Sequence, residues 1–255
     1  MKAFNTNNIT ANITTNTRKT QSFKSATLLK TATLAVSLLV SNLAFAGQSE
    51  IDQIERAASV LNTTELQTLA ESFSGYDKAF SLYRLALSHS LVGDKEMADE
   101  SIDEAMGIME SLNETQPDSV EFKALLAQIY GFKIALEPMK GPYYGIKSNQ
   151  LLEEAETLAE NHPRVQLVKG IAKYNTPPMF GGGKDHAKTA FQQAIAAYEN
   201  DKYSNYHWGE AEAYTWLGLI KLQEGNKALA QADWQQALEI NPDYGWAKML
   251  VQQNK

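Results

Sequence analysis

The sequence has 255 residues and contains no cysteine. The chain therefore forms no disulfide, holds no metal through a thiolate and carries no lipid on a cysteine. Acidic residues are also missing from the first 46 positions, although Asp and Glu number 30 in the whole chain. Because no disulfide supports the fold, a hydrophobic core must stabilise it, and the 209 residues that follow position 46 are enough for one.

The acid-free segment has the features of a secretory signal peptide. Its basic residues precede an apolar run at positions 31–43, which the small-residue motif Ala44-Phe45-Ala46 follows. The run is shorter than the roughly 20 apolar residues that span a bilayer. Two alternatives stay open, an uncleaved anchor and an organellar presequence, although one arginine is few for a presequence. We expect a signal peptide at 1–46, cleavage after Ala46, export to the periplasm and no stable membrane insertion afterwards.

The charge that remains after cleavage is strongly acidic. Five of the 23 basic residues lie in the first 46 positions, which leaves 18 basic against 30 acidic residues, or about −12. Nucleic acid needs a basic face for its phosphates, so we expect no nucleic-acid partner. The same charge disfavours docking on anionic lipid.

Residues 211–244 form the most informative stretch. Two amphipathic helical runs flank Gly225-Asn226, and the second ends at Asn241-Pro242. Small residues alternate with large ones along both runs, at Gly218, Ala230 and Ala237 against Tyr214, Leu217, Trp234 and Leu238. Two helices approach closely only where Cβ is small or absent, so this pattern predicts a tightly packed helical hairpin.

The stretch resembles the tetratricopeptide repeat (TPR), a 34-residue helix–turn–helix unit that stacks into a solenoid. The same small-residue spacing returns at Ala86, Ala98 and Ala105, with Ile102 as the large residue and Gly93-Asp94 as the turn. The resemblance, to TPR proteins of the bacterial exported type, implies an all-α, right-handed helical-hairpin solenoid. We expect about four repeats, at about 77–112, 119–163, 163–200 and 208–243, in one domain at 47–255.

Further helices are expected at both ends of the repeats, where they would cover the exposed faces of the solenoid. One is predicted over residues 49–61 and a second from Glu65, with Thr64 as its N-cap. A last one is predicted over residues 244–253.

The two middle repeats have extended turns, by 12 residues in the second repeat and by five in the third. These inserts carry large apolar residues beside Pro and Gly, at Met139, Tyr143, Tyr144, Met179 and Phe180. Exposed loops seldom carry so many. Either the two inserts pack on each other as a small core, or they form a recognition surface.

No motif predicts catalysis or a cofactor. The triglycine at 181–183 lacks the first glycine, the Ser or Thr and the preceding strand of a phosphate-binding loop. The four histidines have no metal-ligand spacing, and no serine or cysteine nucleophile has its usual context. We therefore expect no enzyme, no cofactor and no metal site.

The resemblance implies that the first helix of each repeat lines a concave groove. Chaperone-binding TPRs hold the terminal carboxylate of a peptide with Lys, Arg and Asn at those positions. This sequence has Tyr, Leu, Gln and Ile there instead. An apolar, aromatic groove suits an amphipathic helix or an apolar ligand, unless the chain's own inserts or capping helices fill it. The candidate partner-binding residues are Tyr83, Phe132, Tyr143, Tyr144, Tyr174, Met179 and Phe180.

The sequence therefore predicts a non-enzymatic, exported TPR scaffold that binds a protein or peptide partner through this groove and the edge loops. The alternative is a small-molecule-binding accessory protein of an envelope transport system.

Overall fold

The computed structural model describes residues 47–202 and 206–254. The described residues all belong to one compact unit of the chain. The predicted signal peptide at 1–46 lies outside the described residues. Within the described part, no helix is long and apolar enough to cross a membrane.

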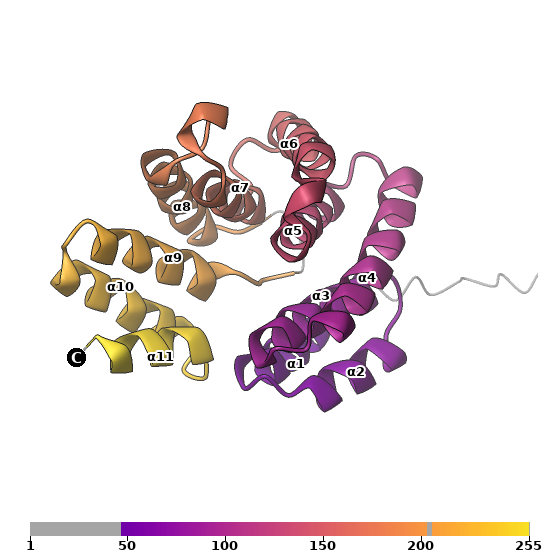
Figure 1. Cartoon of the computed structure of the whole chain (residues 1–255), viewed down its shortest axis with the longest axis horizontal. Helices are drawn as coiled ribbons and strands as arrows, with labels where there is room; N and C mark the ends of the chain where they lie inside the picture. Colours follow the sequence, from indigo (N-terminus) through magenta and orange to yellow (C-terminus); the bar gives the residue numbers. More distant parts are fainter. Residues whose placement is uncertain (1–46, 203–205, 255) are drawn as a thin grey trace, which may run out of the picture. The chain divides into compact units, whose positions relative to one another are not determined.

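The described residues form eleven α-helices and two short 3-10 helices (Figure 1). Their order is α1 (Gln48–Ser59), α2 (Thr63–Ser72), α3 (Gly75–Val92), α4 (Lys95–Thr115), α5 (Val120–Leu136), η1 (Pro138–Lys140), α6 (Gly141–Leu158), α7 (Pro163–Asn175), η2 (Pro178–Phe180), α8 (Lys184–Tyr198), α9 (Glu210–Gln223), α10 (Lys227–Ile240) and α11 (Gly245–Gln253).

Four helical hairpins follow one another along the chain, as predicted: α3 with α4, α5 with α6, α7 with α8, and α9 with α10. In the first hairpin Gly93 ends α3 in the left-handed region at φ 90°, and the Asp94 side chain caps α4. In the last hairpin a Cβ on Gly218 would lie 2.5 Å from Nε1 of Trp234. The glycine therefore gives the Trp234 ring the space in which it packs.

The N-terminal helices α1 and α2 pack against α3, as expected of capping helices. The predicted N-cap of α2 was wrong. The helix begins at Thr63, and the side chain of Asn62, not that of Thr64, accepts a hydrogen bond from the Glu65 backbone N–H. An asparagine three residues before Glu65 is itself a favourable cap, so the helix begins earlier than predicted.

The first insert is mostly helix rather than an extended turn. Residues 138–140 form η1, and α6 then begins at Gly141 with Pro142 in its first turn, where proline is well tolerated. The second insert keeps its turn character, with η2 followed by the triglycine. The prediction of two long loops therefore holds only for the connection between α7 and α8.

Most of the core is one cluster that runs from α1 to α9. A smaller cluster joins α9, α10 and α11 around Trp234, which is fully buried. Small residues at the predicted hairpin positions, including Ala86, Ala98, Ala105, Ala230 and Ala237, are all inaccessible to solvent. The repeat register read from the sequence is therefore the one that packs the helices.

Candidate functional site

Large apolar side chains project into solvent at the α5–α6 and α7–α8 connections. Met139 is 92% exposed, Ile146 70%, Met179 82%, Phe180 73% and Tyr143 58%. We call these five the insert residues. A large apolar side chain gains about 1.5–3 kcal/mol on full burial, so their exposure marks a candidate binding surface.

The α5–α6 connection is held by an aromatic stack beneath the exposed residues. Tyr144 stacks on Tyr130 with ring centroids 5.2 Å apart, and Tyr143 meets Tyr144 edge-on at 5.0 Å. The Lys147 ammonium lies 4.9 Å from the Tyr143 ring centre and 3.2 Å from the Glu110 carboxylate. Tyr144 thus belongs to the supporting layer, whereas Tyr143 is available to a partner.

The α7–α8 connection owes its shape to the triglycine. A Cβ on Gly182 would overlap the Thr176 carbonyl oxygen, and Gly183 adopts φ 116°, where other residues are strained. The Lys173 ammonium donates a hydrogen bond of 2.9 Å to the Gly181 carbonyl. These features hold the loop in a fixed turn from which Met179 and Phe180 project.

The other predicted site residues are more enclosed. Tyr83 is 2% exposed, and its hydroxyl accepts a hydrogen bond of 2.6 Å from Gln128. Phe132 is half-buried and meets Tyr83 edge-on at 6.0 Å. Tyr174 is half-buried against Trp216, with ring centroids 5.0 Å apart. Tyr83 is therefore out of a partner's reach in this structure. Among the described rings, no aromatic contact joins one insert to the other.

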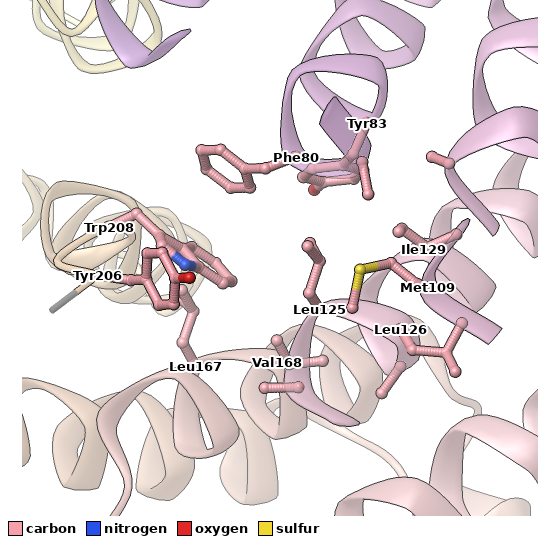
Figure 2. Packing of buried hydrophobic residues seen from close by; sticks show 14 of the residues in the cluster. Phe80, Tyr83, Met109, Leu125, Leu126, Ile129, Leu167, Val168, Tyr206 and Trp208 are labelled. Carbon is pink, nitrogen blue, oxygen red and sulfur yellow. The ribbon is translucent and has the colours of Figure 1, made fainter. Parts of the chain in front are cut away.

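The groove along the first helices is filled by the chain itself. Residues 206–208, which we call the aromatic segment, precede α9 and face α3 and α5 (Figure 2). Tyr206 stacks on Tyr76 at 4.3 Å, and Trp208 lies 5.2 Å from Phe80. Both are buried. Of the two alternatives for the groove, self-filling is therefore the observed one. The filling residues come from the α8–α9 connection rather than from an insert, and Gln48 of the capping helix α1 holds them in place.

Sequence reasoning missed the aromatic segment. The connection between α8 and α9, residues 199–209, is long for a helical-repeat protein, and it carries Tyr206 and Trp208. Length combined with two large aromatic residues was the available signal, because a connection with that composition usually packs on the fold.

A buried ion network closes the groove between α3 and α9. Arg84 lies 2.7 Å from the Glu55 carboxylate of α1 and 3.3 Å from Glu212 of α9. Two carboxylates share one guanidinium, and burial raises the pKa of Glu55 further than the charge of Arg84 lowers it. The network ties the first and last hairpins together.

A second network holds the α5–α7 contact and the start of the long connection. Arg164, fully buried, pairs with both Glu121 of α5 and Asp201. Burial raises the pKa of Glu121, but the hydrogen bond from His162 and the charge of Arg164 outweigh it, so the net shift is downward. Glu121 is therefore ionised and serves as a structural anchor.

Among the described residues no three His, Asp or Glu side chains are grouped so that they could hold a metal ion.

A cavity of about 450 Å³ opens beside the aromatic segment, between α1 and the α10–α11 connection. Its walls are Asp52, Glu55, Arg56, Tyr198, His207, Trp208, Gly209, Glu210, Ala211, Ile240, Asn241 and Asp243.

Comparison with known proteins agrees with this architecture. The tetratricopeptide repeat model matches residues 211–244, which correspond to α9 and α10. The chain contains a tetratricopeptide repeat. No curated protein matches the sequence. The chain is similar in structure to the HusA haemophore from Porphyromonas gingivalis, at 24% identity and a TM-score of 0.52, with 71% of this chain and 96% of that chain covered.

A second similar structure is TTC0263, a thermophilic TPR protein in Thermus thermophilus. It is 18% identical, with a TM-score of 0.46, and the alignment covers 80% of this chain and 98% of that chain. The all-α prediction with sequential hairpin packing is confirmed by the helices and their contacts. The repeat matched at residues 211–244 and the similarity to HusA make the fold TPR-like.

Proposed function

We propose that this TPR scaffold is a non-enzymatic, exported protein that binds a protein or peptide partner through the insert residues. The exposure of Met139, Met179 and Phe180 on fixed turns is the observation that carries the proposal. Because the backbone of the turns is already fixed, binding would order only the side chains, which limits the entropy lost on binding. Tyr143 adds an aromatic ring with a hydroxyl, a residue type that dominates many interfaces.

The half-buried aromatics Phe132 and Tyr174 extend this surface toward the groove. Each is partly buried and packs on the core. Tyr83 takes no part, because Gln128 and Phe132 cover it.

The test compares partner capture by the mature chain and by two double variants. Met179→Ser with Phe180→Ser removes the α7–α8 anchors, and Met139→Ser with Tyr143→Ser removes those of α5–α6. Each should weaken capture from an envelope extract by tenfold or more, since anchors of this kind contribute about 2 kcal/mol or more. Melting temperatures should stay near wild type because the replaced side chains are exposed.

The matched control is Val60→Ser with Leu229→Ser, which removes side chains 67% and 54% exposed outside the two inserts. It should leave capture unchanged. Equal capture by all three variants would refute the proposal. Tyr144 is left intact because its stacking on Tyr130 makes a loss of stability the expected result of its removal.

A small-molecule-binding accessory role in envelope transport is the second candidate, and the cavity of about 450 Å³ favours it. Its volume lies in the range of ordinary ligand sites, and one protein of similar fold is a haemophore. A thermal-shift screen that includes haem distinguishes the candidates. A ligand-dependent rise in melting temperature that Trp208→Phe abolishes would favour this second role.

A further inference from the structure

The two inserts present a methionine in the same way. Residues 138–141 read Pro-Met-Lys-Gly and residues 178–181 read Pro-Met-Phe-Gly, so both inserts carry the pattern Pro-Met-X-Gly. In each, the first three residues form a 3-10 helix, η1 or η2. The same hydrogen bond of 2.9 Å closes both turns, from the N–H of the residue after the methionine to the carbonyl of the residue before the proline. Two consecutive hairpins therefore each hold one methionine in the middle of a fixed turn.

Met139 and Met179 are the most exposed methionines in the described part of the chain. They are 92% and 82% exposed, whereas Met249 is 43% and Met97 37% exposed. The other two described methionines, on α4, are buried or partly buried. The chain has no cysteine, so no thiol competes for an oxidant. A two-electron oxidant reacts first with the sulfur that it reaches most easily, and the two exposed thioethers are therefore its first targets.

We propose that Met139 and Met179 are sites of reversible sulfoxidation, which switches the surface of the insert residues from apolar to polar. The proposal rests on the proposed function, because it assigns a regulation to the same surface. The oxidant is a peroxide. The sulfur lone pair attacks one peroxide oxygen, and an S–O bond forms as the O–O bond breaks. The proton of the attacked oxygen passes to the second oxygen, which leaves as water, so the sulfur loses two electrons and the peroxide gains them.

The sulfoxide is polar and accepts hydrogen bonds, whereas the thioether that it replaces is apolar. Burying such a group against an apolar partner without a donor costs free energy, so oxidation removes one anchor from each insert. The core stays intact, because neither of the two sulfurs is packed in it. Methionine sulfoxide reductases reverse the step: two thiols become a disulfide, and the sulfoxide oxygen leaves as water. The exposed turns make both sulfoxides accessible to such an enzyme.

The experiment treats the mature chain with hydrogen peroxide and follows each methionine by peptide mass spectrometry. Met139 and Met179 should each gain one oxygen about threefold faster or more than Met97 and Met249. As they do so, retention on a hydrophobic-interaction column should fall, and capture of the partner from an envelope extract should fall about tenfold. Circular dichroism at 222 nm should stay unchanged. Treatment with two methionine sulfoxide reductases, one for each sulfoxide epimer, should restore retention and capture.

Two double variants serve as controls. Met139→Leu with Met179→Leu keeps apolar side chains of similar volume but offers no sulfur at the inserts, so peroxide should leave its retention unchanged. Met97→Leu with Met249→Leu should respond to peroxide as the wild type does.

Three results would overturn the proposal: oxidation of Met97 or Met249 as fast as that of the insert methionines, an equal loss of retention by Met139→Leu with Met179→Leu, or no recovery with the reductases. A loss of helical signal would also overturn it, because the oxidation would then act on the core. Failure of the proposed function is a separate result. In that case the untreated Ser variants of the inserts would capture as well as wild type, while the oxidation order and the column retention would still test the oxidation switch.

Discussion

Close packing at Gly218 predicts opposite effects for the same substitution at two helical glycines. Gly218→Ala places a Cβ 2.5 Å from Nε1 and 2.8 Å from Cδ1 of Trp234, and 3.0 Å from the Ala230 carbonyl oxygen. The ring must move, although it is fully buried and donates to the Thr215 carbonyl at 3.2 Å. Gly107 lies within α4, is exposed, and its added Cβ would meet no atom within 4 Å.

The expected changes in the free energy of unfolding differ in sign between Gly107→Ala and Gly218→Ala. Alanine stabilises an exposed helix interior by about 0.8–1 kcal/mol relative to glycine, so Gly107→Ala should gain that amount. Gly218→Ala gains the same helix propensity but loses about 1–3 kcal/mol to overpacking. The loss of the Trp234 hydrogen bond costs about 1 kcal/mol more. We expect Gly218→Ala to be less stable than wild type by about 1–3 kcal/mol.

Urea denaturation followed by circular dichroism at 222 nm measures both changes on the mature chain. A difference of 1 kcal/mol corresponds to roughly 2–4 °C in melting temperature for a domain of this size. Gly218→Ala as stable as Gly107→Ala would refute the close approach of α9 and α10 at this position, and with it the repeat register.

Three further predictions concern the hairpin, a buried acid and the N-terminus. Ala230→Leu should destabilise the chain by about 1–3 kcal/mol, because Ala230 is fully buried against Gly218; a neutral result in urea would contradict the packing. Burial, with the charge of Glu50, raises the pKa of Asp77 to about 7. From about pH 4 to 7 the unfolded chain releases this proton while the folded chain keeps it, so wild-type stability falls as the pH rises. Asp77→Asn should therefore raise the melting temperature at pH 8 and hardly at pH 3, and an equal effect at both would refute the assignment. Export with cleavage after Ala46 should give an intact mass that starts at Gly47; a cytoplasmic species that retains residues 1–46 would contradict it.

Local patterns in the sequence were sufficient to predict the hairpins. Gly218, Ala230 and Trp234 lie within one repeat, and their sizes alone decide how closely two neighbouring helices approach. Met139, Tyr143, Met179 and Phe180 could also be found, because Pro, Gly and large apolar residues in a connection already indicate a shaped turn. Ile146 was not predicted, and the exposure of these side chains is known only from the structure. The sequence does not predict that Tyr144 packs on Tyr130 while Tyr143 stays exposed. This difference depends on α6 beginning at Gly141, because the helix directs the two rings to different sides.

The groove was decided only by the tertiary structure. The contacts that fill and close it join residues far apart in the chain: Gln48 with His207 across 159 positions, Tyr76 with Trp208 across 132, and Arg84 with Glu212 across 128. Whether such residues meet depends on the angle at every hairpin interface between them, and small rotations add up along a stack of repeats. No periodicity within one repeat encodes that sum. The sequence by itself therefore determines the repeat, whereas the accumulated geometry of four hairpins determines that α3 faces α9 and that residues 206–208 occupy the space between.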